Sequence, residues 1–169
     1  MTATERTVVT MTPRQVELVR ETFAQVAPGA NGNGHRLGEQ VSEGQARAFR
    51  HRFGQAFYEN LFRAYPGMRP LFSIDVPRQS QKLMDSFAVI VETLDNPEAL
   101  LPYLGRLGQN HVNYGVVAED YDAMKDVLLE TMAQQLGEEF TDEAAAAWDA
   151  AYERIAELMT RSAEPVPGL

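Results

Sequence analysis

Hydrophobic residues recur at steps of three and four along most of the chain, which is the spacing of amphipathic helices. The first stripe follows Thr12 and Pro13, residue types favoured at the N-cap and at the first position of a helix. Its members are Val16, Val19, Phe23 and Val26. The stripe stops before APGANGNG, where Gly and Asn favour a loop. The pattern therefore predicts a first helix that ends at this segment.

Five further stripes predict five further helices. The second helix covers about 45–64, with Phe49, Phe53, Phe57 and Leu61 at steps of four. YPGMRPLF predicts a turn with a short helical piece, and Asp75 caps a helix with Leu83, Phe87, Ile90, Val91 and Leu94 inside. Asp95 or Asn96 caps the next helix, which begins near Pro97 and carries Leu100, Leu104, Leu107 and His111. The last two are about 118–136, with Tyr121, Met124, Leu128 and Met132, and a helix capped by Thr141, with Trp148, Tyr152, Ile155 and Met159.

Together these elements predict an all-α protein with no strand and no internal repeat, folded as one domain over residues 1–169. The segment at about 27–45 is rich in Gly and Asn and reads as an insertion, which we expect to form a surface loop with extra helical turns. The tail AEPVPGL is expected to be frayed. Gly54 and Ser80 are both small and predict a close crossing of the two helices that carry them.

The composition narrows the classes of function. The chain has 169 residues, 44% hydrophobic, with a mean hydropathy of -0.31 and a formal net charge of -9. Such an acidic chain repels phosphate backbones, so nucleic acids and anionic membrane surfaces are poor partners. GNGHRLG lacks the GxGxxG spacing of a nucleotide-binding loop and follows no predicted strand.

The absence of Cys excludes disulfides, thiolate nucleophiles and iron–sulfur clusters. The N-terminal residues contain no apolar run typical of a signal peptide, and no stretch approaches the roughly 20 apolar residues of a membrane span. We therefore expect a cytoplasmic protein.

His111 is the residue that raises a question of chemistry. It ends the leucine stripe of LGRLGQNHVNYGV, on the face that the stripe predicts to be buried. An imidazole there is either a core histidine with one hydrogen-bond partner or a metal ligand. Helical position alone leaves both readings open.

The order of several segments resembles the globins, in particular bacterial single-domain haemoglobins and the haem domains of flavohaemoglobins. These segments are FYENLFRAYPGMRPLF, RQSQKLM, LDNPEALLPYLGRLGQNHVNYGV, EDYDAMKDVLLETM and LGEEFTDEAAAAWDAAYERIAELM. The resemblance runs from Pro13 to about Met159, interrupted by the insertion. It implies a globin fold of six to eight helices around a haem b group.

The resemblance also implies roles for single residues. His111 matches the proximal histidine that binds haem iron, and Phe72 matches the phenylalanine that packs on the haem. Tyr58 and Gln79 match the distal tyrosine and glutamine, which can donate hydrogen bonds to a bound diatomic ligand at roughly 1.5–3 kcal/mol each. The further residues expected around the haem are Leu83, Leu107, Val116, Tyr121 and Lys82, the last beside a propionate.

Alternatives stand beside these roles. Tyr58 could be a core tyrosine bonded to a backbone carbonyl, Gln79 could turn to solvent, and Lys82 could be a solvated surface lysine. Trp148 and Tyr152 read as core residues.

The match to the family also breaks in places. Flavohaemoglobins carry a glutamate in the last helix that polarises the proximal histidine, and the nearest candidates here are Ala163 and Glu164. The insertion contains His35 and precedes His51, and a second axial ligand from either is an alternative. The insertion could also cover a haem edge or bind a partner.

The expected function is reversible binding of O2, and of NO and CO, with NO dioxygenation supported by an external reductase because no flavin domain follows. The protein is expected to be a monomer or homodimer. Two alternatives remain: a haem-based gas or redox sensor that signals through a protein partner, and a globin-like interaction module without haem.

Overall fold

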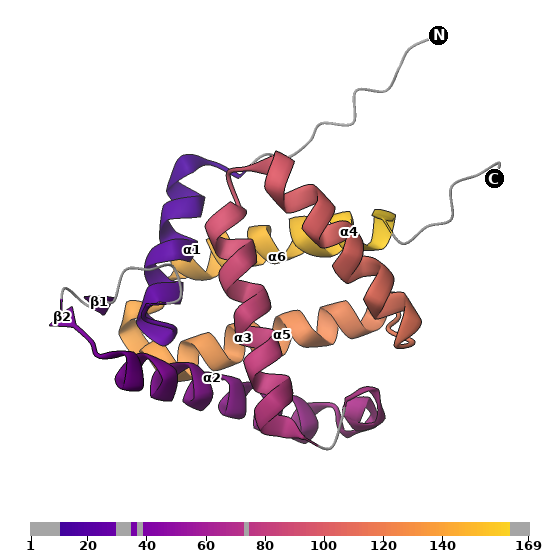
Figure 1. The fold of residues 1–169 in the computed structure, drawn as a ribbon, viewed down its shortest axis with the longest axis horizontal. Coiled ribbons are helices and arrows are strands. Elements are labelled where there is room, and N and C mark those ends of the chain that lie inside the picture. The colour runs from indigo at the N-terminus through magenta and orange to yellow at the C-terminus, as the bar shows by residue number, and fades with distance from the viewer. Residues whose placement is uncertain (1–10, 30–34, 37–38, 73–74, 163–169) are drawn as a thin grey trace, which may run out of the picture.

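The computed structural model describes residues 11–29, 35–36, 39–72 and 75–162. In this part of the chain six α-helices follow one another (Figure 1): α1 Pro13–Val26, α2 Glu43–Ala64, α3 Val76–Thr93, α4 Pro97–Asn113, α5 Ala118–Leu136 and α6 Asp142–Ser162. Two 3-10 helices, η1 Pro66–Leu71 and η2 Gly137–Glu139, fill the corners after α2 and α5. The predicted all-α fold is confirmed, and the observed helices lie within two residues of the predicted ones.

Polar caps explain where the helices begin. The side chains of Thr12, Ser42, Asp75 and Asn96 each accept a hydrogen bond from the backbone N–H three residues further on. Thr141 does the same for Ala144 at the start of α6, at 3.1 Å. Of the two candidate caps for α4, Asn96 is therefore the cap that the fold uses. Proline follows directly at the start of α1, α3 and α4.

The insertion differs from the prediction. Two short strands, β1 His35–Arg36 and β2 Glu39–Gln40, pair antiparallel there, and α2 begins at Glu43, two residues before its predicted start. The expectation of no strand was therefore wrong for this segment, and the expected extra helical turns fall partly on residues outside the described ones. Each strand has two residues, too short for any alternation of polar and apolar positions to reveal it.

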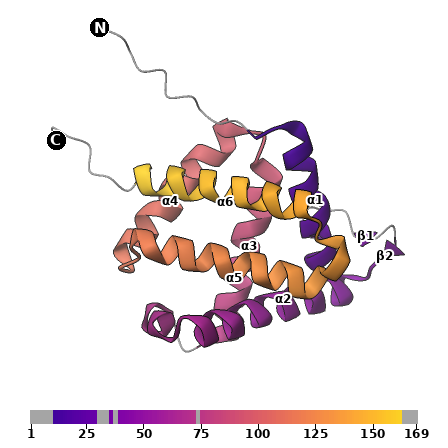
Figure 2. The ribbon, with the colours of Figure 1, turned by 180° about the vertical axis from the view of Figure 1, so that it is seen from behind.

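In the view of Figure 1, α3 crosses in front of α5 and α6, and α4 crosses in front of α6. Figure 2, seen from behind, has α5 and α6 nearest to the viewer. The main packing contacts are α4 on α6, α2 on α3, α1 on α6 and α2 on α5. Within the described residues, no helix has the length and apolar character needed to cross a membrane.

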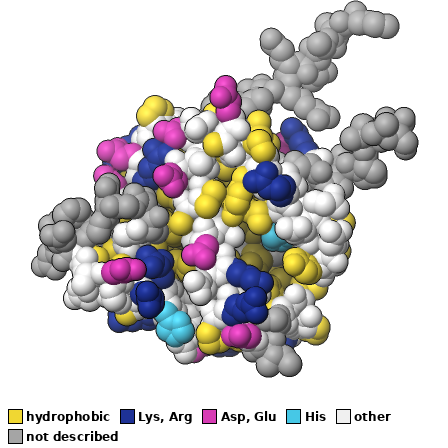
Figure 3. All heavy atoms as spheres, in the orientation of Figure 1, with side chains coloured by type: hydrophobic (Ala, Val, Ile, Leu, Met, Phe, Trp, Pro, Cys, Tyr) yellow, Lys and Arg dark blue, Asp and Glu magenta, His cyan; other side chains and the backbone are white. Residues whose placement is uncertain are grey.

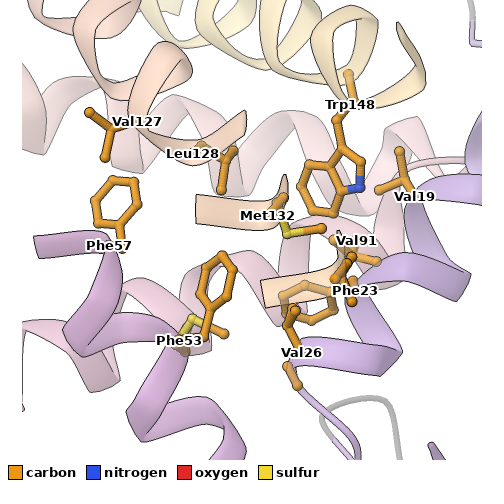
Figure 4. Close-up of a cluster of buried hydrophobic side chains, with 14 of the residues drawn as sticks. Val19, Phe23, Val26, Phe53, Phe57, Val91, Val127, Leu128, Met132 and Trp148 are labelled. Atoms are coloured by element: carbon orange, nitrogen blue, oxygen red, sulfur yellow. The ribbon is translucent and has the colours of Figure 1, made fainter. Parts of the chain in front are cut away.

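The core lies where α1, α2, α5 and α6 meet (Figure 4). All four members of the first predicted stripe are buried, and Phe53, Phe57 and Leu61 of the second are at most 1% exposed. Phe23 and Trp148 pack ring against ring with centroids 6.3 Å apart. The Trp148 indole N–H is satisfied, because it donates to Thr22 Oγ1 at 2.7 Å. Trp148 is thus a core residue, as predicted.

The predicted close crossing of α2 and α3 is confirmed at Gly54 and Ser80. A Cβ atom placed on Gly54 would lie 2.7 Å from the Cβ of Ser80 and 3.3 Å from its Cα. Glycine is therefore required here for α3 to lie directly on α2. Ser80 directly follows Gln79, a predicted site residue. The contact therefore also fixes the distance between α3 and α2 at Gln79.

We expect Gly54→Ala to lower the free energy of unfolding, because overpacking costs about 1–3 kcal/mol and exceeds the gain in helix propensity. Ser80→Gly in the same chain should recover part of the loss, which would appear in urea unfolding as a coupling energy of at least about 0.5 kcal/mol. Gly44→Ala is the control, because a Cβ there meets only Ser42 Oγ at 4.0 Å. Additive effects of the two substitutions would contradict the contact.

Candidate functional site

The two helices that carry most of the predicted site diverge from one short turn. The turn joins α3, which ends at Thr93, to α4, which begins at Pro97 (Figure 1). Gln79 lies 14 residues before Thr93 and His111 lies 14 residues after Pro97, so each is about 21 Å from the turn along its helix. We refer to α3 and α4 as the two arms of the site. Gln79 and His111 therefore lie at equal distances from the turn, one on each arm.

Arg20 of α1 holds this turn. Its guanidinium donates to the carbonyl oxygens of Val91 (3.2 Å) and Glu92 (2.8 Å), which are among the last carbonyls of α3. It also forms a two-point ion pair with Asp95, at 2.7 and 3.1 Å. The cation lowers the pKa of the Asp95 carboxyl through that hydrogen bond. The turn thus has a fixed shape from which the two arms extend.

Tyr58 lies in α2 beneath the first arm and is 1% exposed. Burial raises the pKa of its phenol to about 12, while a hydrogen bond with the Gln79 side chain lowers it. The Gln79 side chain therefore lies beside the buried phenol oxygen, where the two groups interact. Gln79 is half-buried, and the roles of both residues toward a bound ligand stay predictions.

An aromatic group surrounds the Tyr58 ring. Phe72 meets it edge to face at 5.3 Å between centroids, and Phe62 lies 5.8 Å from both Tyr58 and Phe72. Arg69 of η1 places its guanidinium 4.8 Å from the Phe62 ring centroid and donates to the Phe72 carbonyl at 3.4 Å. The half-buried Phe72 ring is thereby held at the end of η1.

His111 is half-buried near the end of α4, and so is less enclosed than its stripe predicted. Its Nδ1 lies 2.7 Å from the carbonyl oxygen of Leu107. A carbonyl oxygen can only accept, so Nδ1 carries the proton and donates. In the neutral imidazole this leaves the Nε2 lone pair available as a ligand.

The end of α4 closes tightly around His111. The N–H of Val116 donates to the His111 carbonyl at 3.0 Å, and Gly115, with φ 82°, makes the turn that allows it. Leu107 and Val116 are both half-buried on either side of the histidine along the chain. Backbone groups of Leu107 and Val116, the two residues expected beside His111, therefore both form hydrogen bonds with it.

Tyr121 of α5 stacks on the His111 imidazole, with ring centroids 5.9 Å apart and planes inclined by 23°. Burial raises the pKa of the Tyr121 phenol. The pKa of Tyr152 on α6 is raised as well, first by burial and then by the charge of the neighbouring Tyr121. The phenol of the half-buried Tyr152 thus lies near enough to Tyr121 for the two to interact electrostatically.

Apolar surface lies between the arms. In the space-filling view of the front face, hydrophobic side chains reach the surface between α3 and α4, bordered by Lys and Arg side chains (Figure 3). Val112 and Val117, near His111 in the sequence, are 48% and 55% exposed. On α3, Leu83 is half-buried against the core, whereas Lys82 is exposed.

The structure thus brings Tyr58, Gln79 and Phe72 together, and separately joins His111 to Leu107, Val116 and Tyr121. His51 is exposed on α2. Nothing is described of the His35 side chain, and Ala163 and Glu164, the candidates for the glutamate, lie outside the described residues.

Sequence reasoning missed several residues of the site. Phe62 is four residues after Tyr58, so helical spacing could have placed it on the same face. Arg69 lies in the 3-10 helix η1, whose conformation decides that its guanidinium reaches Phe62 and the Phe72 carbonyl.

Comparison with known proteins is consistent with this geometry. The family model described as Globin matches residues 55–159, and so begins after the insertion. The Flavohemoprotein of Bordetella parapertussis is 37% identical over 106 residues, 61% of this chain and 26% of that protein. That of Rhizobium meliloti is 30% identical over 108 residues, 62% of this chain and 27% of that protein. The chain therefore spans about a quarter of the length of these relatives.

Solved structures resemble the fold over nearly the whole chain. An engineered carbene transferase from Rhodothermus marinus superposes with a TM-score of 0.70 at 23% identity, covering 91% of this chain and 94% of that one. The flavohemoglobin of Malassezia yamatoensis, solved with bound FAD and heme, gives a TM-score of 0.68 at 19% identity, covering 90% of this chain and 36% of that one. At these identities the likeness concerns the fold alone.

The buried phenol gives a test of the distal pair. Alkaline titration followed by phenolate absorbance, taken as the difference between the wild type and Tyr58→Phe, should show a midpoint near pH 12 rather than the ordinary 10.0. Gln79→Leu should move this midpoint upward, because it removes the hydrogen bond that lowers the pKa. The unfolded chain loses the proton near pH 10 and the folded chain near 12, so Tyr58 contributes a loss of stability as pH rises through this window. A component at the ordinary pH would mean that the phenol is solvated.

Proposed function

The chain belongs to the globin family, and from this premise we propose that it binds haem through His111 and holds O2 and other diatomic ligands beside Tyr58. The proposed domain comprises all six helices. The observation that carries the proposal is the state of His111, whose Nδ1 is occupied by the Leu107 carbonyl.

The residues present fit a haem group. An iron porphyrin needs one neutral imidazole with a free Nε2, and the hydrogen bond at Nδ1 produces that form. It also needs apolar surroundings, which the half-buried Phe72, Leu83, Leu107 and Val116 offer on the two arms. Tyr121, stacked on the imidazole, limits its rotation. The exposed Lys82 has the charge to meet a propionate.

Haem iron held by one imidazole supplies an open coordination position for O2, NO or CO. The chain's own contribution to the ligand is the Tyr58 hydroxyl. Gln79 lies beside the phenol oxygen, and the proposed role of the Tyr58 proton is to donate to a ligand in the site. Phe62 and Phe72 shield this donor from water, where a competing hydrogen bond would weaken it. We therefore propose slow release and high affinity for O2.

The same donor suits oxidation of NO to nitrate, in which NO, O2 and one electron give one nitrate ion. The electron would come from an external flavin-dependent reductase, which is the partner we propose. The support for this finer step is the similarity to flavohemoproteins, together with the buried Tyr58 hydroxyl beside Gln79. Nitrate formation from NO with a supplied electron donor is the measurement that distinguishes it from simple O2 binding.

His111→Ala should remove most of the haem from the purified protein, because it deletes the proposed iron ligand. Absorption spectra of the isolated, reduced, O2-exposed and CO-exposed protein measure this as loss of the Soret band. His51→Ala is the matched control, since that histidine is exposed on α2 and should leave the spectrum unchanged. A wild type without a Soret band after addition of hemin would refute the proposed function and leave the haem-free module.

Tyr58→Phe should speed O2 dissociation at least about tenfold, the equivalent of ~1.4 kcal/mol for one donor. Gln79→Leu should have a smaller effect in the same direction, because Gln79 acts through the phenol. Stopped-flow exchange of O2 for CO measures both rates. An unchanged rate in Tyr58→Phe would exclude Tyr58 as the donor.

A further inference from the structure

The backbone of α4 lies directly on the backbone of α6 at one residue, Gly108. A Cβ atom placed on Gly108 would lie 2.3 Å from the carbonyl oxygen of Met159 and 2.9 Å from its carbonyl carbon. Both atoms belong to the main chain, so no rotation of a side chain could make room. Glycine is therefore the residue that permits this approach.

The peptide group at this contact also holds the proposed ligand. The carbonyl that accepts from His111 Nδ1 at 2.7 Å is that of Leu107, and it belongs to the peptide bond joining Leu107 to Gly108. One edge of this short segment touches α6, and the other orients the imidazole. A shift of Gly108 away from α6 must therefore move the acceptor of the histidine.

On the α6 side of the contact, Met159 is well packed. Met159 is 5% exposed and forms a small hydrophobic cluster with Ile90, Leu100 and Leu104, which are at most 6% exposed. Leu107 and Tyr121 pack against the same cluster. Since Tyr121 stacks on the imidazole, both groups that orient His111 are supported by the cluster that contains Met159.

We propose that the Gly108–Met159 contact positions His111: α6 sets the location of the Leu107 carbonyl, and the carbonyl sets the tautomer and the rotation of the imidazole. Gly108 is thus a positioning residue for the metal ligand. The inference rests on the proposed function insofar as His111 binds haem iron, but the effect on the imidazole exists without haem. Groups that orient metal-bound histidines typically contribute about 10–100-fold to metal affinity.

The first experiment uses the haem-free protein. In ¹⁵N spectra of the neutral His111 ring, the wild type should show mainly the Nδ1–H tautomer, and Gly108→Ala should shift the ratio toward Nε2–H. Val19→Ala is the control for lost stability, because Val19 is 1% exposed in α1 and does not line the site. Gly44→Ala is the control for helix propensity, because its Cβ has room.

The second experiment uses the haem-loaded protein. Gly108→Ala should change the Fe–His stretching frequency in resonance Raman spectra and speed haem loss to excess apomyoglobin at least about tenfold. Val19→Ala should lower the melting temperature without moving the Raman band. If Gly108→Ala does not fold, Met159→Ala replaces it, since it empties part of the cluster that presses α6 onto α4 and should act in the same direction.

The outcomes separate the two proposals. A wild type that binds no haem, with a shifted tautomer ratio in Gly108→Ala, refutes the proposed function and supports the positioning role. A folded Gly108→Ala, or its replacement Met159→Ala, with the tautomer ratio and Raman band of the wild type overturns the positioning role. An equal band shift in Val19→Ala overturns it as well, because general loosening would then explain the effect.

Discussion

Two close backbone contacts, each made by a glycine, hold the helices on which the site is built. Gly54 lets α3 lie on α2 at Ser80, and Gly108 lets α4 lie on α6 at Met159. Each contact falls within one helical turn of a site residue, Gln79 on α3 and His111 on α4. Protein interiors are close-packed and hardly compressible. Contacts this close therefore fix the positions of α3 and α4 more firmly than contacts between flexible side chains would.

Arg20 completes this frame at the point where the arms meet. Its bonds to two carbonyls at the end of α3 and to Asp95 fix the turn, so the divergence of α3 and α4 begins from one geometry. With the turn and both arms fixed, the space between them has a defined shape. The two proposed site groups each have a polar neighbour: Gln79 lies beside the Tyr58 oxygen, and the Leu107 carbonyl accepts from His111 Nδ1.

Most of the fold was predictable because its helices are amphipathic and capped. The stripe of Val16, Val19, Phe23 and Val26 and the caps at Thr12 and Asp75 are local signals, and the structure uses all of them. The site roles came from resemblance instead, since no local pattern links Tyr58 to Gln79. The remaining features depend on tertiary contacts: Gly108 acts only because Met159 of α6 lies against it, and the half-burial of His111 reflects how α4 packs against α6 and α3, which the leucine stripe does not encode.

The frame also separates the two tasks of the site. The Tyr58 hydroxyl, the proposed donor to a ligand, depends on α2, α3 and η1, through Gln79, Phe62 and Phe72. The imidazole depends on α4, α5 and α6, through the Leu107 carbonyl, Tyr121 and the Met159 cluster. The two sets share no described side chain, and substitutions without shared partners tend to act additively. If the proposed roles hold, ligand release and haem retention can therefore be altered independently, because the first would depend on Tyr58 and its neighbours and the second on the Gly108 crossing.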